Sequence, residues 1–320
     1  MSRIYLPCVL CLFLVVGCRE IPQPSGGWHE VESPTDKDLC SVFALSKDNA
    51  WAVGDSGVII HWDGETWSLV ESPTSERLNS VYFVSPDDGW AVGNSGTILH
   101  WDGSMWRIEN SPVSVDLNDV QFLSRNDGWA VGDSGVILYY DNGRWKIMHE
   151  IENKSKIVSL YFLNSEEGLI ASQIITIWHY DNGSWKAIES GFNRICDIHF
   201  VGNKWIISGE SLAEISERRG MVMSYDGKKL SNLLSGCEFI QNYWLCVFFI
   251  EENEGWVAGA DASDTIFWNP TGAENVLHYL NGDWHKVEVS NYRSVYGLYF
   301  IDKHYGWAVG KKGYILKYRR

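Results

Sequence analysis

The feature that most constrains this chain is a repeat with a period of 39 residues. The string LNSVYFVSPDDGWAVGNSGTILHWDGSMW, at residues 78–106, recurs almost unchanged on both sides. Its Trp-Ala-Val-Gly segment begins at Trp51, Trp90 and Trp129, so 39 residues separate each copy from the next. A period of about 40 is typical of supersecondary units that bury their apolar faces only against neighbouring copies. We therefore expect a repeat architecture.

The repeat also indicates what each unit is. Residues 78–84 are rich in aromatic and β-branched residues, and further strand-like runs follow at residues 90–93, 97–101 and 106–109. Turn signals separate these runs, namely Pro-Asp-Asp-Gly, Asn-Ser-Gly and Asp-Gly. Four short antiparallel strands in each repeat predict a β-propeller blade.

Counting the copies predicts an all-β fold, a seven-bladed β-propeller over residues 28–320. The innermost strands are expected to begin near Leu39, Leu78, Leu117, Ile157, Ile195, Leu245 and Val295. The second strands are expected to begin at Trp51, Trp90, Trp129, Leu169, Trp205, Trp256 and Trp307. The outer strands are expected to begin at Trp28, Trp67, Trp106, Trp145, Trp185, Leu230 and Trp284.

The two ends of this range indicate how the ring closes. The range opens with a lone strand of the outer kind at residues 28–31. It ends at residues 314–318 with a strand of the kind that lies third from the axis in each blade. The strand that begins at Trp28 should therefore complete the last blade. Such closure removes the exposed sheet edges that a linear array of repeats would leave.

The repeat explains most of an unusual composition of 17 Trp and 30 Gly. Fourteen tryptophans fall in repeat slots, which leaves Trp178, Trp244 and Trp268 outside the pattern. Alternation of large and small residues suits strands that are buried on both faces, so we assign the repeated tryptophans to the frame. A structural role is also expected for four histidines that share one slot, namely His61, His100, His179 and His278.

Residues 1–17 have the pattern of a lipoprotein signal peptide. Arg3 supplies a positive charge, and the apolar run at residues 4–16 is shorter than the ~20 residues that a spanning helix needs. The Val-Val-Gly-Cys string at residues 15–18 resembles a bacterial lipobox. We therefore expect lipid, palmitate included, on Cys18 and a flexible tether at residues 18–27. The alternative is an ordinary signal peptide with a chance cysteine.

The expected location is the bacterial cell envelope, where several acyl chains on Cys18 would hold the protein stably at a membrane. Arg19 follows Cys18 in place of the Asp that usually retains lipoproteins in the inner membrane. This favours the outer membrane in an organism that has one.

Departures from the repeat are the better guide to function, because the repeat itself is frame. With strands a to d numbered outwards from the channel, the b–c turn swells to residues 210–219 in blade five and to residues 260–275 in blade six. These turns share one face, here called the b–c rim, with the connections between blades. Basic and aromatic residues gather on this rim in blades five to seven, namely Arg194, Arg218, Arg219, Phe267, Trp268, Arg293, Lys311 and Lys312.

We hypothesise that these side chains bind a protein partner. Carboxylates mark the opposite sector of the rim, namely Asp55, Glu71, Glu76, Asp116 and Asp133. The alternative is that long loops merely tolerate insertion and that carboxylates within the insertions neutralise the basic groups.

Four cysteines remain beyond Cys18, namely Cys40, Cys196, Cys237 and Cys246. Disulfides persist in envelope compartments, so a Cys237–Cys246 bond, or one between Cys196 and either of them, is expected, with free buried thiols as the alternative. Cys40, Cys196 and Cys246 are expected to share one register position near a channel mouth, which suggests a metal site. Cys40 belongs to a blade apart from the other two, so we predict no metal and no cofactor.

The repeated Gly-Trp-Ala-Val-Gly, short Gly turn, apolar strand and Asp-Gly-x-x-Trp resemble the propellers of photosystem II stability and assembly factors and their bacterial relatives. That family carries Asp-box repeats of the bacterial neuraminidase type. The resemblance covers residues 28–320 and is strongest in blades one to three and seven. It implies a non-enzymatic seven-bladed propeller that binds protein.

Two other functions stay open. A sialidase-like glycoside hydrolase would also carry Asp-box repeats, with Arg194 and Arg293 serving the substrate carboxylate, but no catalytic constellation is evident. A glycan-binding module is the other alternative, because Trp268 and polar loops suit sugars. A formal net charge of −15 argues against nucleic acid as a partner. No phosphate-binding loop, dinucleotide fingerprint, metalloprotease helix or nucleophile elbow occurs in the sequence.

Overall fold

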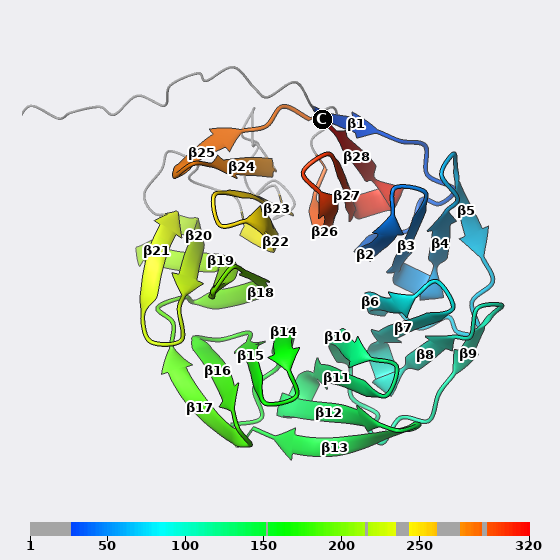
Figure 1. The fold of residues 1–320 in the computed structure, drawn as a ribbon, viewed down its shortest axis with the longest axis horizontal. Helices are drawn as coiled ribbons and strands as arrows, with labels where there is room; N and C mark the ends of the chain where they lie inside the picture. Colours follow the sequence, from blue (N-terminus) through cyan, green and yellow to red (C-terminus); the bar gives the residue numbers. More distant parts are fainter. Residues whose placement is uncertain (1–26, 152, 215–216, 235–242, 261–275, 290–292) are drawn as a thin grey trace, which may run out of the picture.

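The computed structural model describes residues 27–151, 153–214, 217–234, 243–260, 276–289 and 293–320. Within these ranges the chain forms seven antiparallel sheets of four strands each, arranged as blades around a central axis (Figure 1). The seven-bladed propeller that the sequence predicts is confirmed. No helix in the described part of the chain is long and apolar enough to cross a membrane.

The four strands of each blade run outwards from the axis. The a strands are β2 (Leu39–Ser46), β6 (Leu78–Ser85), β10 (Leu117–Ser124), β14 (Ile157–Asn164), β18 (Arg194–Val201), β22 (Tyr243–Glu251) and β26 (Val295–Asp302). The b strands are β3 (Asn49–Gly54), β7 (Asp88–Gly93), β11 (Asp127–Gly132), β15 (Glu167–Ser172), β19 (Lys204–Glu214), β23 (Glu254–Ala260) and β27 (Tyr305–Gly310).

The c strands are β4 (Ile59–Trp62), β8 (Ile98–Trp101), β12 (Val136–Asp141), β16 (Thr176–Asp181), β20 (Glu217–Tyr225), β24 (Val276–Leu280) and β28 (Ile315–Arg319). The d strands are β5 (Trp67–Val70), β9 (Trp106–Ile108), β13 (Arg144–Glu150), β17 (Ser184–Glu189), β21 (Leu230–Leu234), β25 (Asp283–Lys286) and β1 (Gly27–Glu30). Short 3-10 turns join b to c in four blades, namely η1 (Asp55–Gly57), η2 (Asn94–Gly96), η3 (Asp133–Gly135) and η5 (Lys311–Gly313).

The first strand closes the ring, as the sequence predicts. β1 pairs with β28, so the sheet of blade seven has the order β1-β28-β27-β26, and the two strands lie side by side in Figure 1. Trp28 of β1 is buried, and its ring centroid lies 5.5 Å from that of Phe300 and 5.3 Å from that of Tyr318. Both ends of the propeller are therefore held in one blade.

The Gly-Trp pair of strand b fastens neighbouring blades together. Trp90 of blade two stacks on Phe122 of blade three, with 4.7 Å between ring centroids. Phe122 lies flat against Gly128 of its own sheet, where any Cβ would clash with the ring. The same stack joins three further pairs of blades, at Trp51–Phe83 (5.1 Å), Trp129–Phe162 (4.0 Å) and Trp256–Phe300 (4.1 Å).

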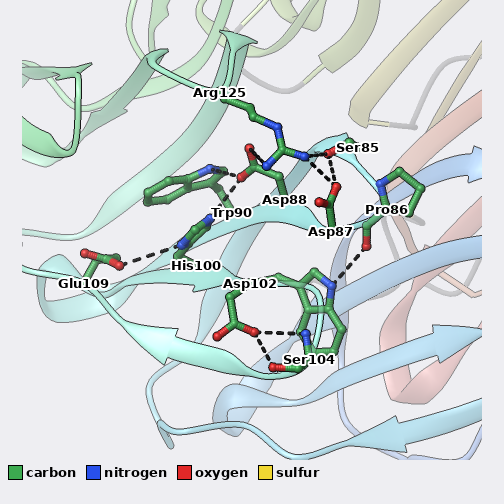
Figure 2. Close-up of polar contacts among 11 residues, drawn as sticks. Ser85, Pro86, Asp87, Asp88, Trp90, His100, Asp102, Ser104, Glu109 and Arg125 are labelled. Carbon is green, nitrogen blue, oxygen red and sulfur yellow. Dashed lines mark hydrogen bonds and ion pairs between the residues drawn. The ribbon is translucent and has the colours of Figure 1, made fainter.

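Hydrogen bonds position two of these tryptophans, Trp51 and Trp90, and Figure 2 shows the arrangement in blade two. Asp88 Oδ1 accepts hydrogen bonds from Trp90 Nε1 at 3.1 Å and from His100 Nε2 at 3.0 Å. The His100 ring stacks on Trp90 with 4.2 Å between centroids. Arg125, from the next blade, forms ion pairs with Asp87 at 2.6 Å and with Asp88 at 3.7 Å.

The histidine slot is filled differently in other blades. In blade one, Asn49 Oδ1 accepts hydrogen bonds from both Trp51 and His61. In blade seven, Lys317 takes the slot, and its ammonium lies 4.1 Å from the ring centroid of Trp62. Burial lowers the pKa of Lys317 to about 8. The slot therefore holds packing and hydrogen-bonding groups of the frame, as its repetition predicts.

Polar side chains tie the innermost strands together around the axis. Every a strand carries a β-bulge near its start. The residues that follow the bulges form one belt, namely Ser41, Ser80, Asp119, Ser159, Asp197, Cys246 and Gly297.

Two carboxylates carry most of the hydrogen bonds in this belt. Asp119 Oδ2 accepts the amide N–H of Leu160 in blade four at 3.0 Å, and Asp197 Oδ2 accepts that of Val247 in blade six at 2.9 Å. The Ser159 hydroxyl lies within 3.1 Å of Asp119 and 3.0 Å of Asp197. Because one hydroxyl has one proton, it satisfies only one of these carboxylates at a time.

In blade six, the first slot of the inner strand lies one residue earlier than predicted. Trp244, and not Leu245, takes the first inner slot, because it pairs with Gly259 as Leu39 pairs with Gly54. Trp244 is fully buried and therefore belongs to the frame, although the repeat pattern excludes it. An aromatic residue replaces the usual Leu here, which hides the start of the strand in the sequence.

This shift also corrects the register of the cysteines. Cys246 aligns with Ser41 in the belt, whereas Cys40 and Cys196 occupy the bulge itself. The prediction that the three cysteines share one position is therefore wrong.

The predicted swollen turn of blade five is largely strand. β19 continues to Glu214 and β20 starts at Glu217, with Glu210 opposite Gly220 and Ser211 opposite Arg219. The additional residues therefore lengthen a hairpin at the b–c rim, with one register shift between Leu212 and Glu214.

Replacing Trp28 by Ala should lower the free energy of unfolding by roughly 3 to 5 kcal/mol, because a buried indole at the ring closure is lost. Urea denaturation followed by tryptophan fluorescence measures the change. His29→Ala in the same strand is the control, since His29 is exposed and its loss should stay within about 0.5 kcal/mol. Equal effects of the two substitutions would contradict the closure.

We expect Asp197 of the belt to make a pH-dependent contribution to the free energy of unfolding. Burial, with the nearby charge of Asp119, raises the pKa of Asp197 to about 7. The folded state then holds a proton that the unfolded state releases above about pH 4, so this contribution to stability is lost as pH rises towards 7. The difference in unfolding free energy between the native protein and Asp197→Asn should fall with pH, by at most ~1.4 kcal/mol per pH unit.

Urea denaturation at a series of pH values measures this difference. Burial lowers the pKa of His199 and of His278 to about 4, so these histidines make the unfolding free energy rise with pH below pH 6.5. Both proteins share this rise, and taking the difference between them removes it. A difference that stays constant from pH 4 to 7 would refute the assignment.

Candidate functional site

The channel through the ring contains a cavity of about 350 Å³ lined by the a strands. Beyond the polar belt, aromatic rings from successive blades lie against one another, with 4.9 Å between the centroids of Phe43 and Tyr82 and 4.2 Å between those of His199 and Phe248. His199 Nε2 donates a hydrogen bond to the carbonyl of Phe249 at 2.9 Å. This hydrogen bond joins blade five to blade six within the channel.

The channel cysteines are not activated nucleophiles. Burial raises the pKa of the Cys40 and Cys196 thiols to about 12, and it also raises that of Cys246. A thiol with a raised pKa holds little thiolate at neutral pH. Within the described ranges, no three His, Cys, Asp or Glu side chains are grouped as metal ligands would be.

The described cysteines, Cys40, Cys196 and Cys246, form no disulfide with one another. The expected alternative bond between Cys196 and Cys246 is therefore not formed. Cys237 lies outside the described residues, and its pairing with Cys246 stays a prediction.

On the b–c rim, ion pairs join consecutive blades. Arg77, at the entrance to blade two, pairs with Asp55 in the turn of blade one. Lys156, at the entrance to blade four, pairs with Asp133 in the turn of blade three at 3.1 Å. Two carboxylates of the acidic sector are thereby paired with cations inside the frame.

Carboxylates also accept backbone amides across the same rim. Asp116 Oδ1 accepts the N–H of Ser95 at 2.9 Å, and Asp38 Oδ1 accepts that of Lys312 at 2.8 Å. Ser95 and Lys312 both have positive φ, which turns the amide outwards towards the next blade. The rim from blade seven through blade four is therefore held by contacts between blades.

The predicted basic residues fall into two groups. In blade seven, the Lys311 amide donates to the carbonyl of Ser294 at 3.0 Å, which brings Lys311 and Lys312 beside the connection that contains Arg293. Arg293 lies over the Tyr314 ring, 5.5 Å from its centroid. Lys312 and Arg293 are exposed.

Arg194 forms the second group, in blade five. It is the first residue of β18 and is exposed. Among the residues that the structure describes, none forms an ion pair with Arg194. Blade six separates it from the blade-seven group, so these cations do not form a single cluster.

The side chains of the other predicted site residues are outside the described part of the structure. The backbone of Arg218 and Arg219 belongs to β20 on the lengthened hairpin, but their side chains are not described. Phe267 and Trp268, with the rest of the blade-six insertion, lie outside the described residues, as do Cys18 and the tether before Gly27.

Sequence reasoning missed one departure on this rim. In blade four, Ile174 and Ile175 occupy the turn positions of Ser56 and Gly57, and their side chains are 58% and 45% exposed. The signal was present, because an apolar pair replaces the Ser-Gly of the repeat. The prediction relied on insertions and did not consider substitutions within a turn of ordinary length.

Comparison with known proteins supports the fold. No protein-family model matches the chain. No curated protein matches it either. Among solved structures, YCF48, a photosystem II assembly factor, in a structure with a bound D1 peptide is 19% identical, with a TM-score of 0.69, covering 92% of this chain and 95% of that one.

Two further structures show the same architecture. YCF48 from Cyanidioschyzon merolae is 20% identical, with a TM-score of 0.69 and coverage of 92% of this chain and 98% of that one. The WD40 propeller domain of Doa1 is 12% identical, with a TM-score of 0.72 and coverage of 92% and 97%. At these identities the likeness shows the fold, a propeller shared with the photosystem II assembly factor YCF48 and with WD40 proteins.

Proposed function

We propose that this chain is a non-enzymatic, membrane-anchored propeller scaffold that binds a protein partner in the bacterial cell envelope through the b–c rim of blades five to seven. The observation that carries the proposal is the distribution of charge on that rim. In the acidic sector, Asp55 and Asp133 pair with cations of the frame and Asp116 accepts a backbone amide. In blades five and seven, Arg194 and Lys312 present exposed cations. Unpaired surface cations steer and orient partners of opposite charge.

The similar fold of YCF48, whose structure contains a D1 peptide, supports protein as the class of ligand. The chemistry of the channel also favours binding over catalysis, because its thiols have raised pKa values and its carboxylates are bonded between blades. For a sialidase-like reaction, Arg194 and Arg293 would need to meet at one substrate carboxylate. They belong to blades five and seven, with a whole blade between them.

The proposed anchor is lipid on Cys18. The chain enters the propeller at Gly27, in the outermost strand of blade seven. Nine residues extend at most ~30 Å, so the lipid would keep the propeller within about one protein diameter of the membrane. Attachment at an outer strand leaves both rims open to a partner.

The rim hypothesis predicts that Arg194→Glu combined with Lys312→Glu lowers recovery of the native partner about tenfold or more, because charge reversal replaces attraction by repulsion. The measurement is quantitative mass spectrometry of proteins cross-linked to the full chain in native membranes. Lys228→Glu combined with Lys303→Glu is the matched control, since both lysines are exposed turn residues of blades five and seven on the opposite rim.

Equal loss in both variants would contradict a specific rim site. A glycan array read with the same proteins tests the alternative ligand. Sugar binding that the rim substitutions abolish, with unchanged protein recovery, would replace protein by glycan as the ligand.

The anchor predicts that Cys18→Ser moves the protein from the membrane fraction to the soluble fraction, because no acyl chain is attached. Cell fractionation with palmitate labelling measures the change. Retention of the substituted protein in membranes would refute lipid anchoring at Cys18, and Cys40→Ser controls for loss of a cysteine elsewhere.

A further inference from the structure

The b–c turn of blade four differs in chemistry from the other short turns of this rim. Blades one to three have Ser-Gly at the tip and blade seven has Lys-Gly, whereas blade four has Ile174-Ile175. Ile174 is 58% exposed and Ile175 is 45% exposed. Exposed apolar residues are common on protein surfaces, so exposure alone does not indicate a function. The backbone of this turn provides the further observation.

The backbone at Ile175 is strained. Its φ is +62°, close to the φ of the glycines in the same position, Gly57 (+72°), Gly96 (+71°), Gly135 (+73°) and Gly313 (+70°). A β-branched residue rarely adopts this conformation, because its Cβ substituents crowd the backbone. The amide of Thr176 donates to the carbonyl of Ile174 at 2.6 Å, and an i to i+2 bond around a residue of positive φ describes a rare and strained γ-turn.

Buried hydroxyls hold the turn in this shape. The carbonyl of Ile175 accepts both the amide of Ser190, at 2.9 Å, and the Ser190 hydroxyl, at 2.5 Å. The Ser172 hydroxyl donates to the carbonyl of Thr176 at 2.7 Å. Ser172 and Ser190 are both buried. The frame therefore fixes the two isoleucines in an outward orientation before any partner arrives.

The frame itself has no need for isoleucine here. In blades one, two and seven the connection to the next blade covers the turn glycine, and a Cβ on Gly57, Gly96 or Gly313 would clash with a backbone carbonyl. In blade four Ile175 carries a side chain at this position, although glycine adopts the same φ with less strain. Strain that persists at an exposed position points to a function of the side chains.

An exposed cation lies directly beside this turn. The amide of Ile195 donates to the carbonyl of Gln173 at 3.2 Å, which joins blade five to the residue before Ile174. Arg194, immediately before Ile195, is exposed and has no ion-pair partner among the residues described. Its neighbour across the sheet, Glu210, is buried. The backbone bond thus brings the exposed residue Arg194 next to the Ile174-Ile175 turn at the junction of blades four and five.

We infer that Ile174, Ile175 and Arg194 form an anchor site for an extended segment of a protein partner in which an apolar side chain lies within a few residues of a carboxylate. The inference rests on the proposed function and extends the binding surface from blade five to blade four. The apolar contact excludes water around the guanidinium and carboxylate, which strengthens their bidentate pairing. A fixed turn also lowers the entropy that binding must overcome.

The test uses the full-length protein in detergent and a phage-displayed library of random dodecapeptides as the probe. Selected peptides should carry Leu, Ile, Phe or Met within a few positions of Asp or Glu. Ile174→Ser with Ile175→Gly, which gives blade four the Ser-Gly tip of blades one to three, should weaken binding of the selected peptides about tenfold, and Arg194→Gln should do the same. Leu69→Ser with Ile108→Ser is the control, since these side chains are 61% and 62% exposed on outer strands.

Thermal unfolding separates binding from packing. The Ser-Gly variant should melt about 2 °C higher than the native chain, because strain at position 175 is relieved. A lower melting temperature would show that the isoleucines stabilise the frame and would overturn the inference. So would selection of no peptides, or of peptides that bind the Ser-Gly variant as well as the native chain.

Failure of the inference is distinguishable from failure of the proposed function. If cross-linked partner recovery depends on Lys312 while the Ser-Gly variant recovers partner normally, the rim of blades five to seven binds protein and the blade-four anchor does not exist. If the Ser-Gly variant loses both peptide and partner but Lys312→Glu loses neither, the anchor stands and the partner-binding surface lies at blades four and five.

Discussion

The structure depends on one repeated contact, the stack of a strand-b tryptophan on a strand-a phenylalanine of the next blade. Trp129 and Phe162 show it most closely, with 4.0 Å between centroids and 8° between ring planes. The phenylalanine reaches this position only because a glycine, Gly168, faces it within its own sheet. Large and small residues are thus required in fixed alternation, and aromatic burial on this scale supplies much of the stability of a repeat frame.

Polar groups make a second set of contacts between neighbouring blades. In the channel, Asp119 and Asp197 accept amides of neighbouring blades, and on the rim Asp38 and Asp116 do the same. Buried backbone amides need acceptors, so short carboxylate side chains between blades satisfy a requirement of the fold. These four carboxylates therefore join blades within the frame.

We therefore assign function to residues that depart from the repeat and do not stabilise the frame. Arg194 and Lys312 present exposed charge, and Ile175 holds a conformation that glycine adopts more readily in the other blades. Each lies on the b–c rim, where side chains can vary without disturbing the stacks. A scaffold with a rigid repeated interior and variable turns matches the general division between frame and binding loops.

The sequence alone determined the architecture, because repetition exposes the frame: a period of 39 residues, seven copies and a lone first strand at Trp28 are enough to predict the closed ring. It also indicated the basic residues of the rim. It did not place Trp244 in the frame, pair Asp55 with Arg77, or show that Glu210 continues a strand. Those features join residues of different blades or strands, and only the tertiary structure, by fixing register and spacing between blades, decided which of them meet.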